Sequence, residues 1–197
     1  MKTRIAFFDF DGTITTHDTF LELIKFYKGK FTFYLGFAIN AAFIVAWKAG
    51  LISNQSAKEK VLTYFFKGTP QPDFQEHCNE FSRLYIPRLI RSKALQEIKQ
   101  LKDAGTTVVI VSASAENWLT AWCTENNLEL LATKLVIKNG LLTGKIEGLN
   151  CHGWEKVSRI KAAFDLSQYD EVYCYGDTKG DKPMLELATF AFYKPFR

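Results

Sequence analysis

The chain has 197 residues, of which 47% are hydrophobic, and 17 of them are phenylalanines. This length suits one domain, or a core with a modest insertion, and the apolar content excludes a disordered chain. The formal net charge is +4 without an arginine-rich stripe, so a nucleic-acid-binding surface is not expected.

The cysteines lack the paired spacing of a zinc site or of a disulfide framework; they are Cys78, Cys123, Cys151 and Cys174. We therefore expect buried, reduced thiols in a cytoplasmic protein. The sequence ahead of Asp9 is too short for the apolar stretch of a signal peptide, and no other targeting motif is found. Contact with the inner face of the membrane stays open, because of an apolar segment described below.

The first predicted element is a short buried strand that ends in two acids. Residues 5–8 are apolar, and Asp9 and Asp11 follow with one residue between them. In an extended chain these two carboxylates share one face. Such crowding is unfavourable unless a proton or a cation relieves it, and a hard divalent ion such as Mg²⁺ is suited to oxygen ligands. Gly12 after Asp11 is also compatible with an ordinary turn, so this segment alone leaves both interpretations open.

Residues 17–91 are predicted to be almost wholly helical. Apolar residues at helical spacing between residues 20 and 27 precede Gly29, which is expected to end the first helix. A second helix is expected to begin after Ser53 and a third after residue 69, with Pro87 kinking or ending the third.

Residues 31–47 form an uncharged, aromatic-rich segment within this helical region. Lys28 and Lys30 precede the segment and Lys48 follows it. Three interpretations are open: a buried helix of a small helical subdomain, an interfacial helix or hairpin lying on a bilayer, or a transmembrane span. The length of 17 residues lies at the short edge for a span.

After residue 91, apolar strands alternate with helices. This pattern predicts an α/β fold in which a Rossmann-like parallel sheet forms the core and a helical cap is inserted after the first strand. The predicted core comprises residues 1–16 and 92–197, and the predicted cap residues 17–91. The expected elements are helices at 92–104, around Trp118 and Trp122, at 154–164 and from 182, strands at 106–111, 171–175 and 190–193, and a hairpin around Asn139 and Gly140.

Polar residues follow several of these strands, and ligands of open α/β sheets bind at the carboxyl ends of the strands. We expect these residues to meet although they are far apart in the sequence. Acids that hold Mg²⁺, together with a hydroxyl and a lysine that neutralise a phosphate, are what phosphoryl transfer requires. The converging residues are Asp9, Asp11, Ser112, Lys156, Asp177 and Asp181. Taken singly, Ser112 and Asp181 could instead cap helices, and Lys156 could lie on a solvated helix face.

These segments resemble the four motifs of the haloacid dehalogenase superfamily of aspartate-nucleophile phosphatases, in order and over nearly the whole chain. The Asp-x-Asp-Gly-Thr motif matches residues 9–13, the apolar strand ending in Ser or Thr matches residues 108–112, the motif lysine matches Lys156, and Gly-Asp-x(3)-Asp matches residues 176–181. The resemblance implies that Asp9 forms an aspartyl-phosphate, that Asp11 acts as general acid and base, and that Lys156 pairs with Asp9 and the phosphate.

The same resemblance implies a Mg²⁺ cofactor and a phosphomonoester substrate. The metal would be held by Asp9, by the carbonyl of Asp11 and by Asp177, with Asp181 nearby or acting through water. The phosphoryl group would be bound by the hydroxyl of Ser112 and by backbone amides, with Gly12 and Ala113 as the candidate positions.

The helical insertion resembles the cap of the phosphoserine phosphatase-like branch, in which an acid nine residues beyond the nucleophile grips the substrate amine. Asp18 occupies that position here, where phosphoserine phosphatases carry Glu, and the apolar residues 31–47 disfavour a free amino acid substrate. A closer resemblance is to the phosphatidylglycerophosphatase C-like group, which has an apolar, basic-flanked cap and a Gly-x-Glu-Lys third motif.

This closer resemblance implies a lipid or amphiphilic phosphomonoester such as phosphatidylglycerophosphate, with peripheral membrane contact through the cap. The alternatives are a soluble small-metabolite phosphatase and a non-catalytic module that binds Mg²⁺ and phosphate. The sequence does not predict the oligomeric state.

Overall fold

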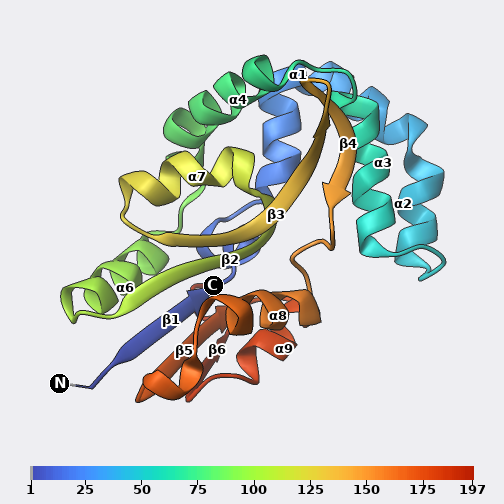
Figure 1. Cartoon of the computed structure of the whole chain (residues 1–197). Coiled ribbons are helices and arrows are strands. Elements are labelled where there is room, and N and C mark those ends of the chain that lie inside the picture. The colour runs from blue at the N-terminus through green and yellow to red at the C-terminus, as the bar shows by residue number, and fades with distance from the viewer. Residues whose placement is uncertain (1) are drawn as a thin grey trace.

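The computed structural model describes residues 2–197, which contain a six-stranded sheet in the order β4-β3-β2-β1-β5-β6 (Figure 1). The central strand β1 pairs in parallel with β2 on one side and with β5 on the other. Strand β2 pairs in parallel with β3, and β5 pairs in parallel with β6. The edge strand β4 is antiparallel to β3. The predicted α/β fold with a parallel sheet is therefore confirmed. The strands are β1 (Arg4–Phe8), β2 (Thr107–Ala115), β3 (Glu129–Lys138), β4 (Leu141–Glu147), β5 (Glu171–Gly176) and β6 (Phe190–Tyr193).

The sheet is covered by apolar side chains on both faces. Successive residues of a buried strand point to opposite faces, so a continuous apolar run supplies both. In β1, Ala6 and Phe8 pack into one cluster of buried side chains, while Ile5 and Phe7 pack into another. Helices cover the two faces (Figure 1). These are α6 (Ser92–Asp103) and α7 (Glu116–Glu125) against the first cluster, and α8 (Trp154–Ala163) and α9 (Lys182–Leu185) against the second.

A group of helices between β1 and α6 lies beyond one end of the parallel strands (Figure 1). It also contacts the hairpin that β3 and β4 form, since Thr63 donates a hydrogen bond to the Gly144 carbonyl at 3.3 Å and Glu59 accepts one from the Ile146 amide at 3.1 Å. The division into a core and a cap of residues 17–91 stays a prediction. The helices are α1 (Thr19–Ile39), α2 (Ala41–Lys48), α3 (Asn54–Phe66), α4 (Gln71–Glu80) and α5 (Ile86–Leu89).

The structure tests the expected helix end at Gly29 and the interpretations of residues 31–47. The expected end of the first helix at Gly29 is confirmed: Gly29 has non-helical backbone angles, with a φ of 80°, and divides α1 into two helical segments, of which the second reaches Ile39. Residues 31–47 are not a fully buried helix, because Phe31 is 81% exposed and every residue of α2 is at least partly exposed, although Phe33, Gly36 and Asn40 are buried. Within residues 2–197, no individual helix is long and apolar enough to cross a membrane. Helices α1 and α2 taken together are long and apolar enough, but they meet at a 62° bend.

Candidate active site

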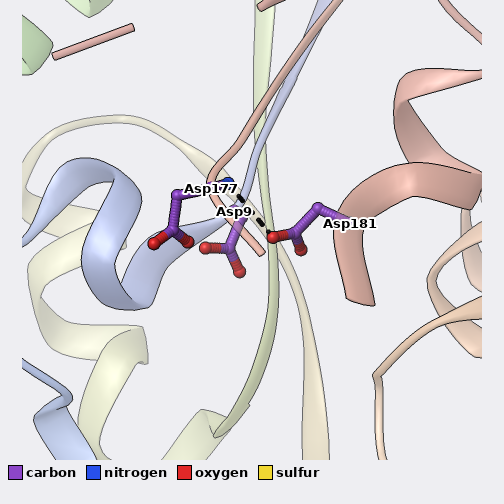
Figure 2. A group of neighbouring side chains, drawn as sticks. All are labelled: Asp9, Asp177 and Asp181. Carbon is purple, nitrogen blue, oxygen red and sulfur yellow. Dashed lines mark hydrogen bonds between the residues drawn. The ribbon is translucent and has the colours of Figure 1, made fainter. Parts of the chain in front are cut away.

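Three buried carboxylates gather at the carboxyl ends of the two central strands (Figure 2). Asp9 follows β1, Asp177 follows β5, and Asp181 ends the short turn Lys179–Asp181 that leads into α9. One oxygen from each lies within 4.8 Å of the others. Strands β1 and β5 are parallel neighbours, so residues that follow them must emerge at the same edge. Three hard oxygen donors at this separation are a suitable ligand set for Mg²⁺.

Lys156, in the first turn of α8, joins two of these acids and is only 1% exposed. Its Nζ lies 2.6 Å from Asp9 Oδ1 and 2.7 Å from Asp181 Oδ1. Burial by itself lowers the pKa of Lys156, but the two carboxylates outweigh burial and raise it. The predicted gathering of acids and lysine is therefore seen, and the interpretation of Lys156 as a solvated surface residue is wrong.

The ammonium of Lys156 affects the pKa values of the three buried carboxylates to different extents. Burial raises the pKa of Asp9 to about 7, although Lys156 opposes the rise. Burial alone would also raise the pKa of Asp181, but Lys156 and the hydrogen bonds from Thr178 hold that pKa below its ordinary value. Burial, with the nearby Asp181, raises the pKa of Asp177. The cluster therefore carries excess negative charge that a divalent cation would neutralise.

Thr13 bridges Asp9 and Asp177, and Gly12 leaves room for the Asp177 carboxylate. The Thr13 hydroxyl lies within hydrogen-bond distance of both acids, 2.9 Å from Asp9 Oδ2 and 3.2 Å from Asp177 Oδ1, and its one proton is shared between them. A Cβ at Gly12 would stand 2.7 Å from Asp177 Oδ2, and Gly12 has a φ of 85°, so only glycine fits here. Asp177 Oδ2 forms an ion pair with Arg197.

Asp11 turns its carboxylate away from this cluster. Oδ1 accepts hydrogen bonds from the Thr19 amide and hydroxyl, both at 2.6 Å, and Oδ2 accepts one from Ser114 at 2.6 Å. Binding of a metal by the Asp11 carbonyl stays a prediction. Because Thr19 is the first residue of α1, the helix start fixes the carboxylate.

The other predicted binding residues surround Asp11. Ser112 lies 3.5 Å from Asp11 Oδ2 and accepts from the Ser114 amide at 3.0 Å, so it does not cap α7, whose N-cap is Ala115. Strand β2 is longer than predicted, because it continues past Ser112 to Ala115. Its pairing with β3 shifts register between Ser112 and Ala115. The Ala113 carbonyl accepts from Lys58 Nζ at 2.5 Å.

Asp18 lies apart from the acidic cluster and caps α1, accepting from the Leu21 amide at 3.0 Å. The residue is exposed, although the protein near its carboxylate, together with Asp11, raises the pKa of Asp18. Its predicted contact with substrate stays a prediction, as do the roles of the other site residues.

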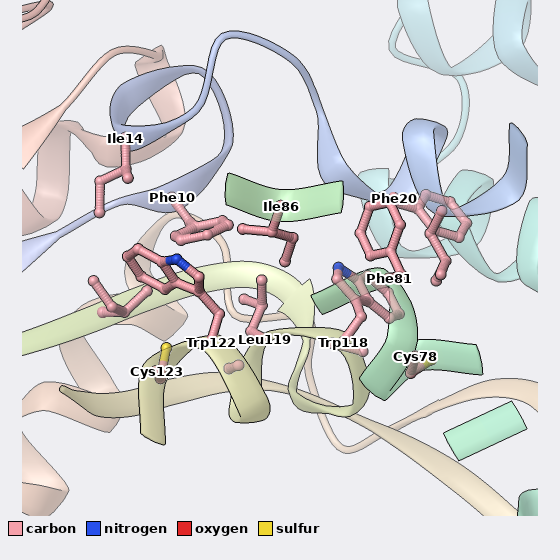
Figure 3. Packing of buried hydrophobic residues seen from close by; sticks show 14 of the residues in the cluster. Phe10, Ile14, Phe20, Cys78, Phe81, Ile86, Trp118, Leu119, Trp122 and Cys123 are labelled. Atoms are coloured by element: carbon pink, nitrogen blue, oxygen red, sulfur yellow. The ribbon is translucent and has the colours of Figure 1, made fainter. Parts of the chain in front are cut away.

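Aromatic packing fixes the segments that carry the acids (Figure 3). Phe10, between Asp9 and Asp11, contacts Trp122 of α7 edge-on at a centroid distance of 5.2 Å. Phe20 stacks on Trp118, whose indole N–H donates to Thr19 at 3.2 Å. The packed aromatic core therefore begins immediately beside Asp9 and Asp11.

Sequence reasoning missed two cations at the site, Lys58 and Arg197. Neither belongs to a recognisable motif, and each reaches the site through folding of a distant segment. Thr19 and Ser114 were also missed, although each lies close in sequence to a motif.

Known proteins are similar to this chain over nearly its whole length. Protein CicA of Caulobacter vibrioides is 29% identical, covering 96% of this chain and 85% of the relative. A Bordetella pertussis protein of unknown function has a TM-score of 0.81 at 22% identity, covering 96% of this chain and 88% of the other. A phosphoserine phosphohydrolase-like protein from Francisella tularensis has a TM-score of 0.70 at 17% identity, covering 97% and 86%.

The sequence also matches a protein family directly, over residues 6–186. That range includes every acid of the cluster, Lys156 and the residues around Asp11. The chain belongs to the family of haloacid dehalogenase-like hydrolases.

Proposed function

We propose that this hydrolase is a Mg²⁺-dependent phosphomonoesterase that works through an aspartyl-phosphate on Asp9. The observation that carries the proposal is the buried group of Asp9, Asp177 and Asp181 around Lys156. Asp9, Asp177 and the Asp11 carbonyl would hold the ion. Asp181 would act through water, because its two oxygens already accept from Lys156 and from Thr178. When bound, Mg²⁺ supplies positive charge to the phosphoryl oxygens.

The reaction has two steps at the side chains of this chain. A carboxylate oxygen of Asp9 attacks phosphorus, the bond to the ester oxygen breaks, and Asp11 gives that oxygen a proton. Asp11 then takes a proton from water, which attacks the phosphoryl group and releases Asp9. The hydrogen bonds from Thr19 and Ser114 orient Asp11 for both transfers.

We further propose that the substrate is a lipid or amphiphilic phosphomonoester, such as phosphatidylglycerophosphate. The support is an exposed apolar surface along α1 and α2. Large apolar exposed surfaces mark interaction sites, and each basic residue near an anionic membrane adds roughly 1 kcal/mol. Lys28, Lys30 and Lys48 flank the segment. The apolar surface comprises Phe31, Tyr34, Leu35, Ile39, Phe43, Val45, Trp47 and Leu51.

Helix α3 connects this apolar surface to the catalytic centre. Lys60 of α3 lies over the Phe43 ring, with Nζ 4.8 Å from its centroid. Lys58 on the same helix bonds the Ala113 carbonyl beside Ser112. A membrane-bound cap could therefore present a headgroup to the site.

Hydrolysis by the purified protein tests both parts of the proposal. Phosphatidylglycerophosphate in mixed micelles, phosphoserine and p-nitrophenyl phosphate would each be assayed with Mg²⁺ and with EDTA. We expect Mg²⁺-dependent hydrolysis that favours the lipid. Comparable turnover of phosphoserine would refute the lipid preference and favour a soluble-metabolite phosphatase. Absence of hydrolysis of any phosphomonoester would refute the phosphatase itself.

Variants of the apolar surface separate membrane contact from chemistry. The double variant Phe31→Ser, Leu51→Ser changes two residues that are 81% and 78% exposed, so the core stays intact. We expect it to lose co-sedimentation with anionic liposomes. The matched control is Leu95→Ser, at an exposed leucine of α6. Equal loss in both variants, or in neither, would contradict a specific membrane-contacting surface.

A further inference from the structure

Two lysines reach the candidate site from different elements, and their surroundings differ. Lys156 is bonded to two carboxylates within 2.7 Å. The ammonium of Lys58, from α3, bonds the Ala113 carbonyl at 2.5 Å. Within the part of the chain that the structure describes, residues 2–197, no carboxylate oxygen forms an ion pair with Lys58 inside 4.0 Å. Lys58 therefore has one neutral partner where Lys156 has two charged ones.

This arrangement leaves a positive charge incompletely compensated. Burial lowers the pKa of Lys58, and the more distant Asp18 and Asp11 only partly oppose that effect. An ammonium has three N–H donors, of which one carbonyl uses one. Lys58 is half-buried, and a charge that is partly withdrawn from water is stabilised by an opposite charge, so an anion that is not part of the protein would complete the surroundings of Lys58.

The neighbours of Lys58 identify which end of the substrate it would meet. Lys58 bonds the Ala113 carbonyl, and Ala113 directly follows Ser112, whose hydroxyl lies 3.5 Å from Oδ2 of Asp11, the group proposed to protonate the leaving oxygen. Phe20 supports the lysine, with its ring centroid 5.5 Å from Nζ. Lys156, in contrast, contacts the nucleophile Asp9. Lys58 thus lies on the side of the departing alcohol.

We propose that Lys58 binds a second anionic group carried by the alcohol part of the substrate. The substrate class is then phosphomonoesters whose alcohol bears a further phosphate or phosphodiester. This inference rests on the proposed function and determines specificity within it. A lipid headgroup and a free bisphosphate share this chemistry, and soluble probes distinguish the anion from the acyl chains.

The test compares glycerol 1,3-bisphosphate with glycerol 3-phosphate, which lacks the second phosphate. For each, kcat/KM would be measured with Mg²⁺ for the wild type and for Lys58→Gln, which keeps a donor for the Ala113 carbonyl but removes the charge. We expect the wild type to have a higher kcat/KM for the bisphosphate than for glycerol 3-phosphate. In Lys58→Gln the ratio of the two kcat/KM values should fall by roughly 10- to 100-fold, which corresponds to one charge-assisted hydrogen bond. Lys58→Arg should retain most of the wild-type preference.

Lys60→Gln is the matched control, because Lys60 is on the same helix but is exposed and lies over Phe43. It should leave the preference unchanged. Equal preference in the wild type and Lys58→Gln, or an equal loss on both substrates in Lys58→Gln, would overturn the role of Lys58 while the phosphatase proposal stands. A wild type inactive on both substrates and on p-nitrophenyl phosphate would overturn both.

Discussion

Replacing Asp9 with asparagine should stabilise the metal-free protein at high pH, although Asp9 is the proposed nucleophile. Burial raises the pKa of Asp9 from 3.8 to about 7. The folded state therefore binds this proton more tightly than the unfolded chain does. The stability contributed by the protonated carboxyl is fully present below about pH 4 and is lost as the pH rises through about 7.

The magnitude follows from the shift. Each pH unit between the two pKa values changes the free energy of unfolding by about 1.4 kcal/mol, so the wild type loses about 2 to 3 kcal/mol between pH 5 and pH 8 through this residue. Asp9→Asn does not titrate and avoids that loss. For a chain of this size, the difference corresponds to roughly 5 to 10 °C in Tm.

The assay is urea unfolding in EDTA at pH 5 and pH 8 for the wild type and Asp9→Asn. We expect the stability of the variant relative to the wild type to increase by about 2 to 3 kcal/mol at the higher pH. Asp103→Asn, at an exposed aspartate of α6, is the control and should show no such change. A relative stability of Asp9→Asn that is the same at both pH values would refute the reasoning about the buried acids.

Three further outcomes follow from the contacts of the site and the fold. Lys156→Met should lower the free energy of unfolding in EDTA at pH 8 by roughly 3 to 5 kcal/mol, because it leaves two buried carboxylates unpaired; an effect below 1 kcal/mol would contradict the importance of that pairing. Arg197→Ala should tighten Mg²⁺ binding measured by calorimetry, since Arg197 pairs with Asp177 and competes with the ion, whereas an unchanged Kd would show no competition. Gly144→Ala should lower Tm more than Gly140→Ala. Both glycines have positive φ, but only a Cβ at Gly144 would meet the backbone of α3, at 2.4 Å. Equal losses of Tm in the two variants would argue against that close approach.

The parts of the fold that depend on local sequence could be predicted. Residues 5–8 and 171–175 are short apolar runs that end in polar residues, and both are parallel strands of the sheet. Asn139 and Gly140 both have positive φ at the hairpin turn, as their residue types favour. Because parallel strands deliver their following residues to one edge, the meeting of Asp9 and Asp177 also followed from the sequence.

Contacts between distant segments could not be predicted. Nothing in the sequence around Lys58 or Arg197 distinguishes them from solvated surface residues, yet folding brings each to a reactive segment. The exposure of residues 31–47 was also not predictable, because an apolar segment that packs in a core and one that faces a partner have the same composition.

The most direct test of the account is hydrolysis of p-nitrophenyl phosphate by the wild type and by Asp9→Asn, each with Mg²⁺ and with EDTA. The grouping of Asp9, Asp177 and Asp181 around Lys156 predicts turnover only by the wild type and only with the metal. Turnover by Asp9→Asn at the rate of the wild type, or turnover by the wild type that EDTA leaves unchanged, would contradict it.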